Sequence, residues 1–383
     1  MKEFKKNKIK ICHFVNRVTG KEDGVFRHLC AQIKFLDNSL YEQFVISQGD
    51  FFVENIFREL NIKYYSLPLL NKKYSIRIFF HVAKIISLEN ADIINAHSLK
   101  PYIIAGLMNF FLRRKIIFSY HGSFIENDYN TKLDKFIYKI LHHIICRINN
   151  VNALVPSRRN KNILISETKL FSRIDFYYNG YLPIYFSEGI DANLFSELHQ
   201  LKEKYFVIGY TGRLNREKNV KCAIKILYEL KNHNVFLVIF GDGEERVMLE
   251  NYALSLSIGN IKFYGFVHDA VHYMKLFDLL ILTSKTEGLP IVIWEAMFNK
   301  IPVISTDAGG VKEIIEENNC GFIFSCKNYQ EAVSKIILLM NDKTLCKKLG
   351  ENGYQAIVKK YNLNNFKIFF EKYYYNLVNE GRN

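Results

Sequence analysis

The stretch FVIGYTG (206–212) begins a series of short apolar segments, which continues with VFLVIFG (235–241), IKFYGFV (261–267), DLLILTS (278–284), IPVIST (301–306) and CGFIF (320–324). Segments with helical patterns separate them. Runs such as VFLVIF and LLIL are continuously apolar, which is typical of parallel strands covered by helices on both faces. Regular alternation of strands and helices over this length predicts a doubly wound α/β domain.

The first half of the chain shows the same rhythm, and its strand candidates are KIKICHFV (8–15), YEQFVISQ (41–48), ADIINAHS (91–98), KIIFSYHG (115–122), NALVPS (152–157) and IDFYYNG (174–180). A chain of 383 residues suits two domains. The alternation breaks near 181–200, so we expect domains at 1–183 and 184–364. The stretch NFKIFFEKYYYNLV (365–378) has the pattern of an amphipathic helix, and we expect 365–383 to pack back onto the first domain.

Composition favours a globular protein, with 49% hydrophobic and 23% charged residues. No apolar run approaches the roughly 18 residues of a membrane span. The basic start MKEFKKNKIK leads into a short apolar stretch without a small-residue cleavage site, which predicts a cytoplasmic protein. The seven cysteines are scattered and form no C-x-x-C pair, as expected of reduced thiols.

The net charge of +14 is concentrated in the first half. Residues 1–190 carry 28 Lys and Arg against 16 Asp and Glu, whereas residues 191–383 carry 24 against 22. Basic and apolar residues interleave in MNFFLRRK (108–115) and KFIYKILHHIICRI (135–148), which suits either a solvated basic surface or a helix on anionic lipid. No nucleic-acid-binding motif accompanies the charge, so we do not expect nucleic acid as a partner.

The loop GRLNREKN (212–219) follows one of the predicted strands. Gly212 lets the chain turn, Arg213 and Lys218 enter the crevice at the strand end, and a helix begins near Asn219. Ligands of doubly wound sheets bind at this edge, and two cations beside a helix N-terminus suit a diphosphate. An ordinary basic strand–helix loop is the alternative.

The segment EGLPIVIWEAM (287–297) follows the strand at 278–284. Pro290 suits the first turn of a helix, and the amides of Gly288 and Leu289 would then face the crevice. Glu287 stands at the mouth and Glu295 lies inside the helix, so that one carboxylate could meet a sugar while the other accepts from hydroxyls further along. The alternative is that Glu287 only caps the helix and that Glu295 is a surface residue of it.

The segment TSKTEGLPIVIWEAMFNKIPVISTDAGGVKEII (283–315) resembles the donor-binding motif of glycosyltransferase family 4, a group of retaining enzymes with the GT-B fold. Its E-x7-E pair, the G-R-x-x-x-x-K element in YTGRLNREKN (210–219), and the strands in IFGDGEE (239–245) and IKFYGFV (261–267) occur in the family's order. The likeness covers about 150 residues closely and the rest loosely. It implies two Rossmann-like doubly wound domains facing a central cleft.

The resemblance also implies roles for individual residues of the second domain. Arg213 and Lys218 would bind the donor diphosphate. Glu295 would bind the ribose, and Glu287 would bind the transferred sugar. The remaining donor-binding positions would be the chain at Gly288, Leu289 and Pro290 and, beside the base, at Phe266 and Val267. Gly309 and Gly310 resemble a further turn near the donor, and a simple loop is the alternative.

In the first domain, KICHFVNRVTGKEDGVFRHLC (10–30) resembles the family's first strand and its glycine-rich donor loop, of which Gly20 and Gly24 remain. The segment ADIINAHSLK (91–100) resembles one that has two histidines; Asn95 replaces the first and His97 keeps the second. KIIFSYHG (115–122) places His121 at the family's active-site His-Gly, where it would orient the sugar or the reacting hydroxyl.

Together these features predict a retaining hexosyltransferase that uses a UDP- or GDP-linked sugar and a saccharide or lipid-linked acceptor. Its setting would be the synthesis of bacterial O-antigen, capsule or lipopolysaccharide at the inner face of the cytoplasmic membrane. No D-x-D signature appears and cations already cover the diphosphate, so we expect no metal and no cofactor. The alternatives are a nucleotide-sugar 2-epimerase and a basic nucleic-acid-binding protein.

Overall fold

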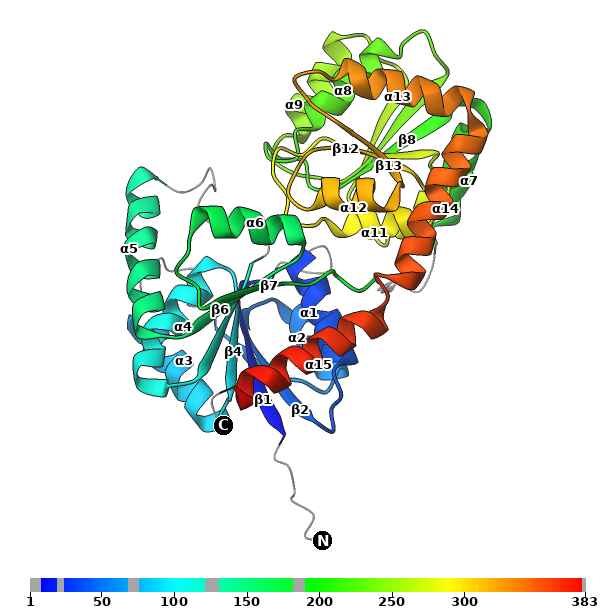
Figure 1. Ribbon diagram of the computed structural model, residues 1–383. Coiled ribbons are helices and arrows are strands. Elements are labelled where there is room, and N and C mark those ends of the chain that lie inside the picture. Colours follow the sequence, from blue (N-terminus) through cyan, green and yellow to red (C-terminus); the bar gives the residue numbers. More distant parts are fainter. Residues whose placement is uncertain (1–7, 19–23, 68–75, 121–130, 182–189, 381–383) are drawn as a thin grey trace. The chain divides into compact units, whose positions relative to one another are not determined.

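The computed structural model describes residues 8–18, 24–67, 76–120, 131–181 and 190–380, which fall into two units (Figure 1). The first unit comprises Met1–Gly180 and Leu363–Asn383, and the second comprises Tyr181–Asn362. The joints therefore lie two or three residues before the positions expected from the sequence, 183/184 and 364/365.

A parallel sheet forms the centre of the first unit, with the strand order β3-β2-β1-β4-β5-β6-β7. Its strands are β1 (Ile9–Arg17), β2 (Tyr41–Gln48), β3 (Lys63–Ser66), β4 (Ile93–His97), β5 (Lys115–Ser119), β6 (Val151–Val155) and β7 (Arg173–Phe176). Every residue of β4 and β6 is buried, because helices cover both faces of the sheet.

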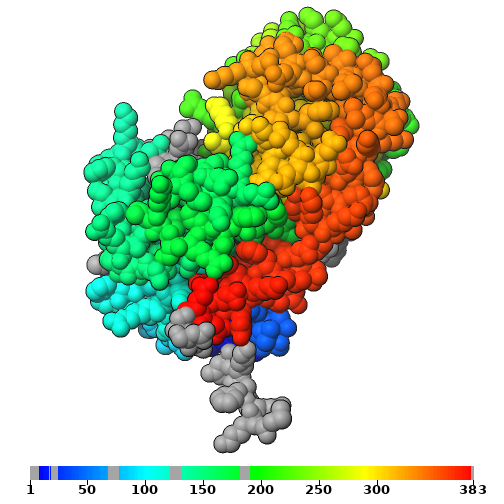
Figure 2. Space-filling view, in the orientation of Figure 1, coloured from blue at the N-terminus to red at the C-terminus, as the bar shows by residue number. Residues whose placement is uncertain are grey.

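The helices that follow these strands are α1 (Gly24–Phe35), α2 (Phe51–Glu59), α3 (Ile76–Glu89), α4 (Leu99–Leu112), α5 (Lys132–Ile148) and α6 (Arg158–Glu167). A capping box of Thr131 and Asp134 starts α5, which stabilises its first turn by about 1 kcal/mol. α4 and α5 approach closely at Gly106, where a Cβ would lie 2.4 Å from a methyl carbon of Ile145. In the space-filling view, the outer side of α5 is open at the margin of this unit (Figure 2).

The C-terminal helix α15 (Leu363–Asn379) packs on the first unit beside β1 and α1. Phe366, Phe370 and Tyr374 are buried there, each contributing about 2 kcal/mol of apolar burial. The Tyr374 hydroxyl also accepts hydrogen bonds from the side-chain amides of Gln32 and Asn95. The end of the chain is therefore part of the first unit's core.

The second unit has a parallel sheet in the order β10-β9-β8-β11-β12-β13. Its strands are β8 (Phe206–Thr211), β9 (Val235–Phe240), β10 (Ile261–Gly265), β11 (Leu279–Leu282), β12 (Val303–Thr306) and β13 (Gly321–Phe324). Its helices are α7 (Ala192–Lys204), α8 (Val220–Glu229), α9 (Arg246–Ser255), α10 (Val271–Met274), α11 (Ile291–Phe298), α12 (Val311–Asn318), α13 (Gln330–Asn341) and α14 (Lys343–Lys359).

The predicted doubly wound α/β fold is confirmed in both units. β3 is missing from the sequence prediction because it is a four-residue edge strand whose residues are exposed or half-buried, which leaves no apolar run to recognise. Several strands end two or three residues before the last residue of the segment from which they were predicted, because the chain turns into the following loop there. Across the described residues, no helix is both long enough and apolar enough to span a membrane.

Candidate functional site

The order of strands in the second unit creates a switch point between β8 and β11. From β8 the chain proceeds outward to β9 and β10 on one side, then returns to place β11 on the other side of β8. The loops that follow β8 and β11 both lie at the carboxyl edge of this switch point, which is where doubly wound sheets bind ligands. The sequence motif 212–219 lies in the first of these loops, and the motif 287–297 begins in the second loop and continues into α11.

Hydrogen bonds join the two loops directly. The Lys285 amide donates to the Glu217 carbonyl at 2.8 Å, and the Thr283 hydroxyl donates to the Lys218 carbonyl at 3.0 Å. One backbone–backbone and one side-chain–backbone hydrogen bond thus fix the loops to each other, which sets the positions from which their charged side chains project.

Lys218 and Glu287 form an ion pair at the centre of this arrangement. The Lys218 Nζ lies 2.5 Å from the Glu287 Oε1, with side chains that are 26% and 10% exposed. The Ser284 hydroxyl donates to the same carboxylate oxygen at 2.6 Å. The structure therefore brings together two residues that the sequence assigns separately to the diphosphate and to the sugar.

Arg213 lies in the same loop as Lys218 but is exposed, and within the described residues it forms no salt bridge. Its backbone carbonyl accepts a hydrogen bond from the Tyr210 hydroxyl at 3.1 Å. Burial, with a further contribution from the charge of Glu287, raises the pKa of Tyr210, so this phenol stays neutral beneath the site. Lys218 is therefore paired with the Glu287 carboxylate, whereas Arg213 is exposed to an anion that arrives from solvent.

The chain that follows β12 contacts the loop that carries Glu287 and supports it. The Gly310 amide donates to the Gly288 carbonyl at 3.0 Å, and Gly288 and Leu289 are buried. Gly309 has a φ of +53°, and a Cβ there would lie 1.9 Å from the Glu287 carbonyl oxygen. Only glycine fits this close approach, which gives the expected turn at Gly309 a physical reason.

Pro290 differs from its expected position. The sequence predicts it inside the first turn of the helix, whereas α11 begins at Ile291 and Pro290 is the N-cap residue, with φ −69° and ψ 130°. The prediction of its helical position is therefore wrong by one residue. The extended ψ arises because a cap residue precedes the first helical dihedrals.

Glu295 lies inside α11 and is buried, with 6% of its surface exposed. Phe266 and Val267 follow β10 at the far edge of the sheet, two strands from β8. Phe266 is exposed, and its ring meets the His268 ring edge-on at 4.6 Å. These positions lie at the same carboxyl edge as the ion pair but on separate elements.

The first-unit candidates fall partly outside the described residues. Gly20 and His121 lie outside the described residues, whereas Gly24 is the first residue of α1. His97 is buried at the end of β4, and its Nε2 lies 3.1 Å from the Nδ1 of His13. Burial lowers the pKa of His13 to about 4, so the His13 imidazole is neutral at physiological pH.

Two family models match the chain side by side. Glycosyltransferase Family 4 matches residues 23–181, and Glycosyl transferases group 1 matches residues 192–356. The chain belongs to glycosyltransferase family 4. It is therefore a glycosyltransferase, and the two matches correspond closely to its two units.

Relatives of this glycosyltransferase span nearly its full length. It is 23% identical over 370 residues to the Escherichia coli UDP-Gal:alpha-D-GlcNAc-diphosphoundecaprenol alpha-1,3-galactosyltransferase, covering 93% of this chain and 94% of that protein. It is 25% identical over 284 residues to the Staphylococcus aureus capsular polysaccharide biosynthesis glycosyltransferase CapM, covering 72% and 74%. The Anabaena Alr3699/HepE structure with UDP and glucose is 20% identical, with a TM-score of 0.79 over 95% of this chain and 99% of that one, which shows the shared GT-B fold.

Sequence reasoning missed several side chains that build the site of this glycosyltransferase. Ser284 hydrogen-bonds Glu287, Thr283 ties the two loops together, and the Thr306 hydroxyl donates to the Ser284 carbonyl at 2.6 Å. The sequence signal that could have identified them is that small hydroxyl residues directly follow the apolar strand β11 and end the apolar strand β12. Such residues are common in loops, and only the contacts identify them as supports of the motif.

Proposed function

We propose that this glycosyltransferase moves a hexose from a UDP- or GDP-linked sugar to a saccharide acceptor, with retention of the anomeric configuration. The observation that carries the proposal is the Lys218–Glu287 ion pair beside the exposed Arg213, at the switch point of the second sheet. The setting we propose is bacterial cell-surface polysaccharide synthesis. The names of the Escherichia coli and Staphylococcus aureus relatives support that setting.

The ion pair suggests how the donor is accepted. A diphosphate arriving beside Arg213 offers Lys218 a second anion, and the ammonium group can exchange the carboxylate for phosphate oxygens. The released Glu287 carboxylate then accepts hydrogen bonds from sugar hydroxyls, while Ser284 continues to hold one of its oxygens. After the exchange the Lys218 ammonium group is paired with phosphate, and the Glu287 carboxylate is hydrogen-bonded by Ser284 and by the sugar hydroxyls, so neither group is left without a partner in a site of limited solvent access.

Departure of the nucleoside diphosphate is the chemical step that these residues assist. Negative charge grows on the diphosphate as the glycosidic bond breaks, and the cations Arg213 and Lys218 would stabilise it. Loss of one such preorganised group typically lowers the rate about 10²–10³-fold. Glu295 would accept from the ribose, and His121 would orient the sugar or the attacking hydroxyl, as the family resemblance implies.

We also propose that transfer needs no metal ion, because Arg213 and Lys218 supply the charge that a divalent cation would otherwise bring to the diphosphate. EDTA is therefore expected to leave the transfer rate unchanged. A rate that falls in EDTA and returns with added Mg²⁺ or Mn²⁺ would overturn this part of the proposal.

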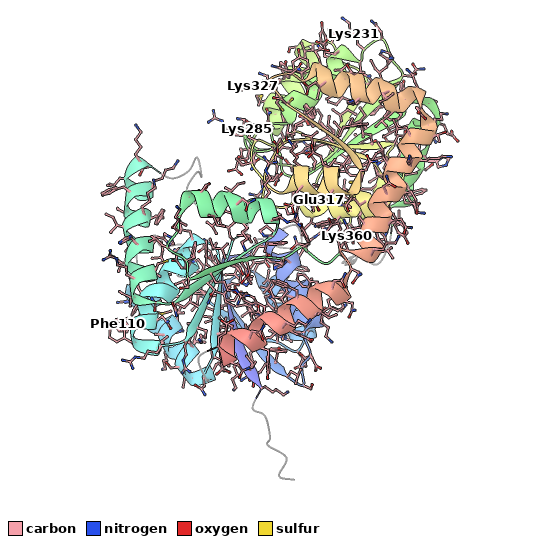
Figure 3. The ribbon with its side chains drawn as sticks, in the orientation of Figure 1. Phe110, Lys231, Lys285, Glu317, Lys327 and Lys360 are labelled. Atoms are coloured by element: carbon pink, nitrogen blue, oxygen red, sulfur yellow. The ribbon has the colours of Figure 1, made fainter. Side chains whose placement is uncertain are left out.

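The acceptor is proposed to be lipid-linked, as it is by name in the Escherichia coli relative. The outer face of α5 supports this, because it carries a stripe of exposed apolar side chains: Leu133, Phe136, Ile140, Ile144 and Ile148. A basic row lies along the stripe, with Lys132, Lys139, His143 and Arg147 exposed. Phe110 projects from the end of the neighbouring α4 (Figure 3). Such a face suits an anionic bilayer, where each cation contributes about 1 kcal/mol.

The transfer proposal is tested with the full chain, a panel of UDP- and GDP-sugars and a diphosphoundecaprenol-linked monosaccharide. We expect release of UDP or GDP that depends on the acceptor, and a product whose anomeric coupling in NMR matches that of the donor. Conversion of the donor to an epimer without acceptor would favour the 2-epimerase. Binding of oligonucleotides that weakens steeply with salt, and no binding of any nucleotide sugar, would favour the nucleic-acid alternative.

The membrane proposal is tested by flotation with vesicles of phosphatidylglycerol or of phosphatidylcholine. The protein is expected to float with the anionic vesicles alone. Lys132→Glu with Lys139→Glu should reduce flotation, whereas the matched control Lys347→Glu with Lys348→Glu, on exposed residues of α14, should not. Equal flotation of both double variants would contradict the role of α5.

A further inference from the structure

Three polar side chains stand at the carboxyl ends of neighbouring strands in the first sheet. Gln48 is the last residue of β2, Asn16 is the next-to-last residue of β1, and Ser98 directly follows β4. β1 lies between β2 and β4. Gln48 pairs with Arg17, and the residue before Asn16 pairs with the residue before Ser98. The three positions therefore lie almost level across two strand spacings, or about 10 Å.

Each of these side chains has an oxygen that is shielded from solvent and lacks a partner. Within the described residues, the Asn16 Oδ1, the Gln48 Oε1 and the Ser98 Oγ form no hydrogen bond. A buried polar atom without a partner is costly, and native structures seldom keep one unless water, an ion or a ligand pairs with it. Here three such atoms lie on adjacent strands, at the edge where doubly wound sheets bind ligands.

The backbone at these strand ends is irregular as well. Ser98 has a φ of +127° and a ψ of 167°, which side-chain-bearing residues rarely adopt. It is the N-cap residue of α4, yet its side chain makes no capping hydrogen bond. The register of β1 against β2 also shifts between Phe14 and Arg17, next to Asn16. Strained residues and register shifts of this kind concentrate at binding sites, where they aim side chains at a ligand.

The chemistry of the three groups indicates what they bind. Each side chain as a whole is half-buried, so part of it reaches solvent. Rotation about the terminal torsion of a carboxamide is soft and turns the oxygens of Asn16 and Gln48 toward a bound molecule. None of the groups is charged, and their oxygens need donors. Sugar hydroxyl groups meet this need because each of them both donates and accepts, whereas a phosphate offers only acceptors and would leave the oxygens unpartnered.

We propose that Asn16, Gln48 and Ser98 form a subsite that binds an uncharged sugar ring of the acceptor through its hydroxyl groups. The role of that sugar as acceptor rests on the proposed function, whereas its binding to the first unit does not. The subsite is separate from the cationic donor residues, which belong to the second unit.

The first test measures the stability of the free protein. Asn16→Leu and Gln48→Met replace an unpartnered oxygen with apolar atoms of similar size, so neither should lower the thermal midpoint. The matched contrast is Asn95→Leu, because the Asn95 amide accepts from Ser119 and donates to Tyr374. This variant should lower the midpoint clearly. An equal loss in all three variants would show that Asn16 and Gln48 have structural partners, and would overturn the proposal.

The second test titrates the full chain with methyl glycosides of glucose, galactose and N-acetylglucosamine, and follows the side-chain amide signals of asparagine and glutamine by NMR. Asn16→Leu and Gln48→Met identify the two signals. We expect one or more of the glycosides to shift both signals, and glycerol to shift neither. If every glycoside leaves both signals unmoved, the oxygens are paired with ordered water only and the subsite does not exist.

The third test measures transfer to the diphosphoundecaprenol-linked monosaccharide. Asn16→Leu, Gln48→Met and Ser98→Ala should each raise the KM for this acceptor about tenfold and change the KM for the nucleotide sugar little. The control is Ser39→Ala, an exposed residue before the amino end of β2. An unchanged acceptor KM in all three variants would refute the subsite. Glycoside binding by an unsubstituted protein that transfers no sugar would instead count against the proposed function.

Discussion

The ion pair of Lys218 and Glu287 makes a quantitative prediction through three variants: Lys218→Met, Glu287→Gln and the double substitution. At 2.5 Å, the gross attraction is about 7 kcal/mol for an effective dielectric constant of 20. Desolvation offsets most of this, and the partial exposure of both side chains reduces it further. We expect a net coupling free energy of about 2 kcal/mol.

The two single variants should not be equivalent. Lys218→Met leaves the Glu287 carboxylate, 10% exposed, without its cation, whereas Glu287→Gln leaves an ammonium group that is 26% exposed and can be hydrated. We therefore expect Lys218→Met to cost about 3 kcal/mol and Glu287→Gln about 1 kcal/mol. At about 2–4 °C per kcal/mol, the first should lower the thermal midpoint by about 9 °C.

Scanning calorimetry of the four proteins gives the double-mutant cycle, and Arg216→Met, an exposed residue of the same loop, is the control, with an expected change below about 0.5 kcal/mol. Each single variant should also slow transfer about 100-fold or more. Additive stability changes, within about 0.5 kcal/mol, would refute the coupling. A larger loss for Glu287→Gln than for Lys218→Met would refute the argument from burial.

Three further predictions concern the supports of the fold. Gly309→Ala should lower both UDP affinity and the thermal midpoint, because its Cβ would collide with the Glu287 carbonyl oxygen; calorimetry that finds both unchanged would show that the loop is not constrained there. His13 and His142 are buried, and desolvation lowers the pKa of each from 6.5 to about 4. Between pH 4 and pH 6.5 the unfolded chain binds more protons than the folded chain does. The contribution of each neutral histidine to the free energy of unfolding is therefore fully present above pH 6.5 and is lost as the pH falls toward 4. Urea unfolding at pH 7.5 and pH 5 should show a loss of about 2 kcal/mol per histidine, and an equal or greater stability at pH 5 would contradict this. Tyr374→Phe should destabilise the protein by about 2 kcal/mol, because two buried amides lose their acceptor; an unchanged urea midpoint would show that the end of the chain is not held by these bonds.

The sequence by itself determined the fold class and the loops that form the candidate site. Both depend on local patterns: continuously apolar runs predict buried parallel strands, and the residues just after them must lie at the carboxyl edge. The motifs around Arg213, Lys218 and Glu287 were recognisable for the same reason, since each is contiguous in the chain. The edge strand β3 is not predicted from the sequence, because its four residues are exposed or half-buried and form no apolar pattern.

The tertiary structure alone decided which distant groups meet. Lys218 and Glu287 are 69 positions apart, and reasoning from separate motifs treats them as independent ligands, whereas the adjacency of β8 and β11 makes them one ion pair. The same holds for Tyr374 against Asn95, for His13 against His97, and for the Cys326 thiol against Asn219 and Thr283. Such contacts follow from strand order and helix packing, which minimise the exposed apolar surface of the whole chain, and no local stretch of residues encodes them.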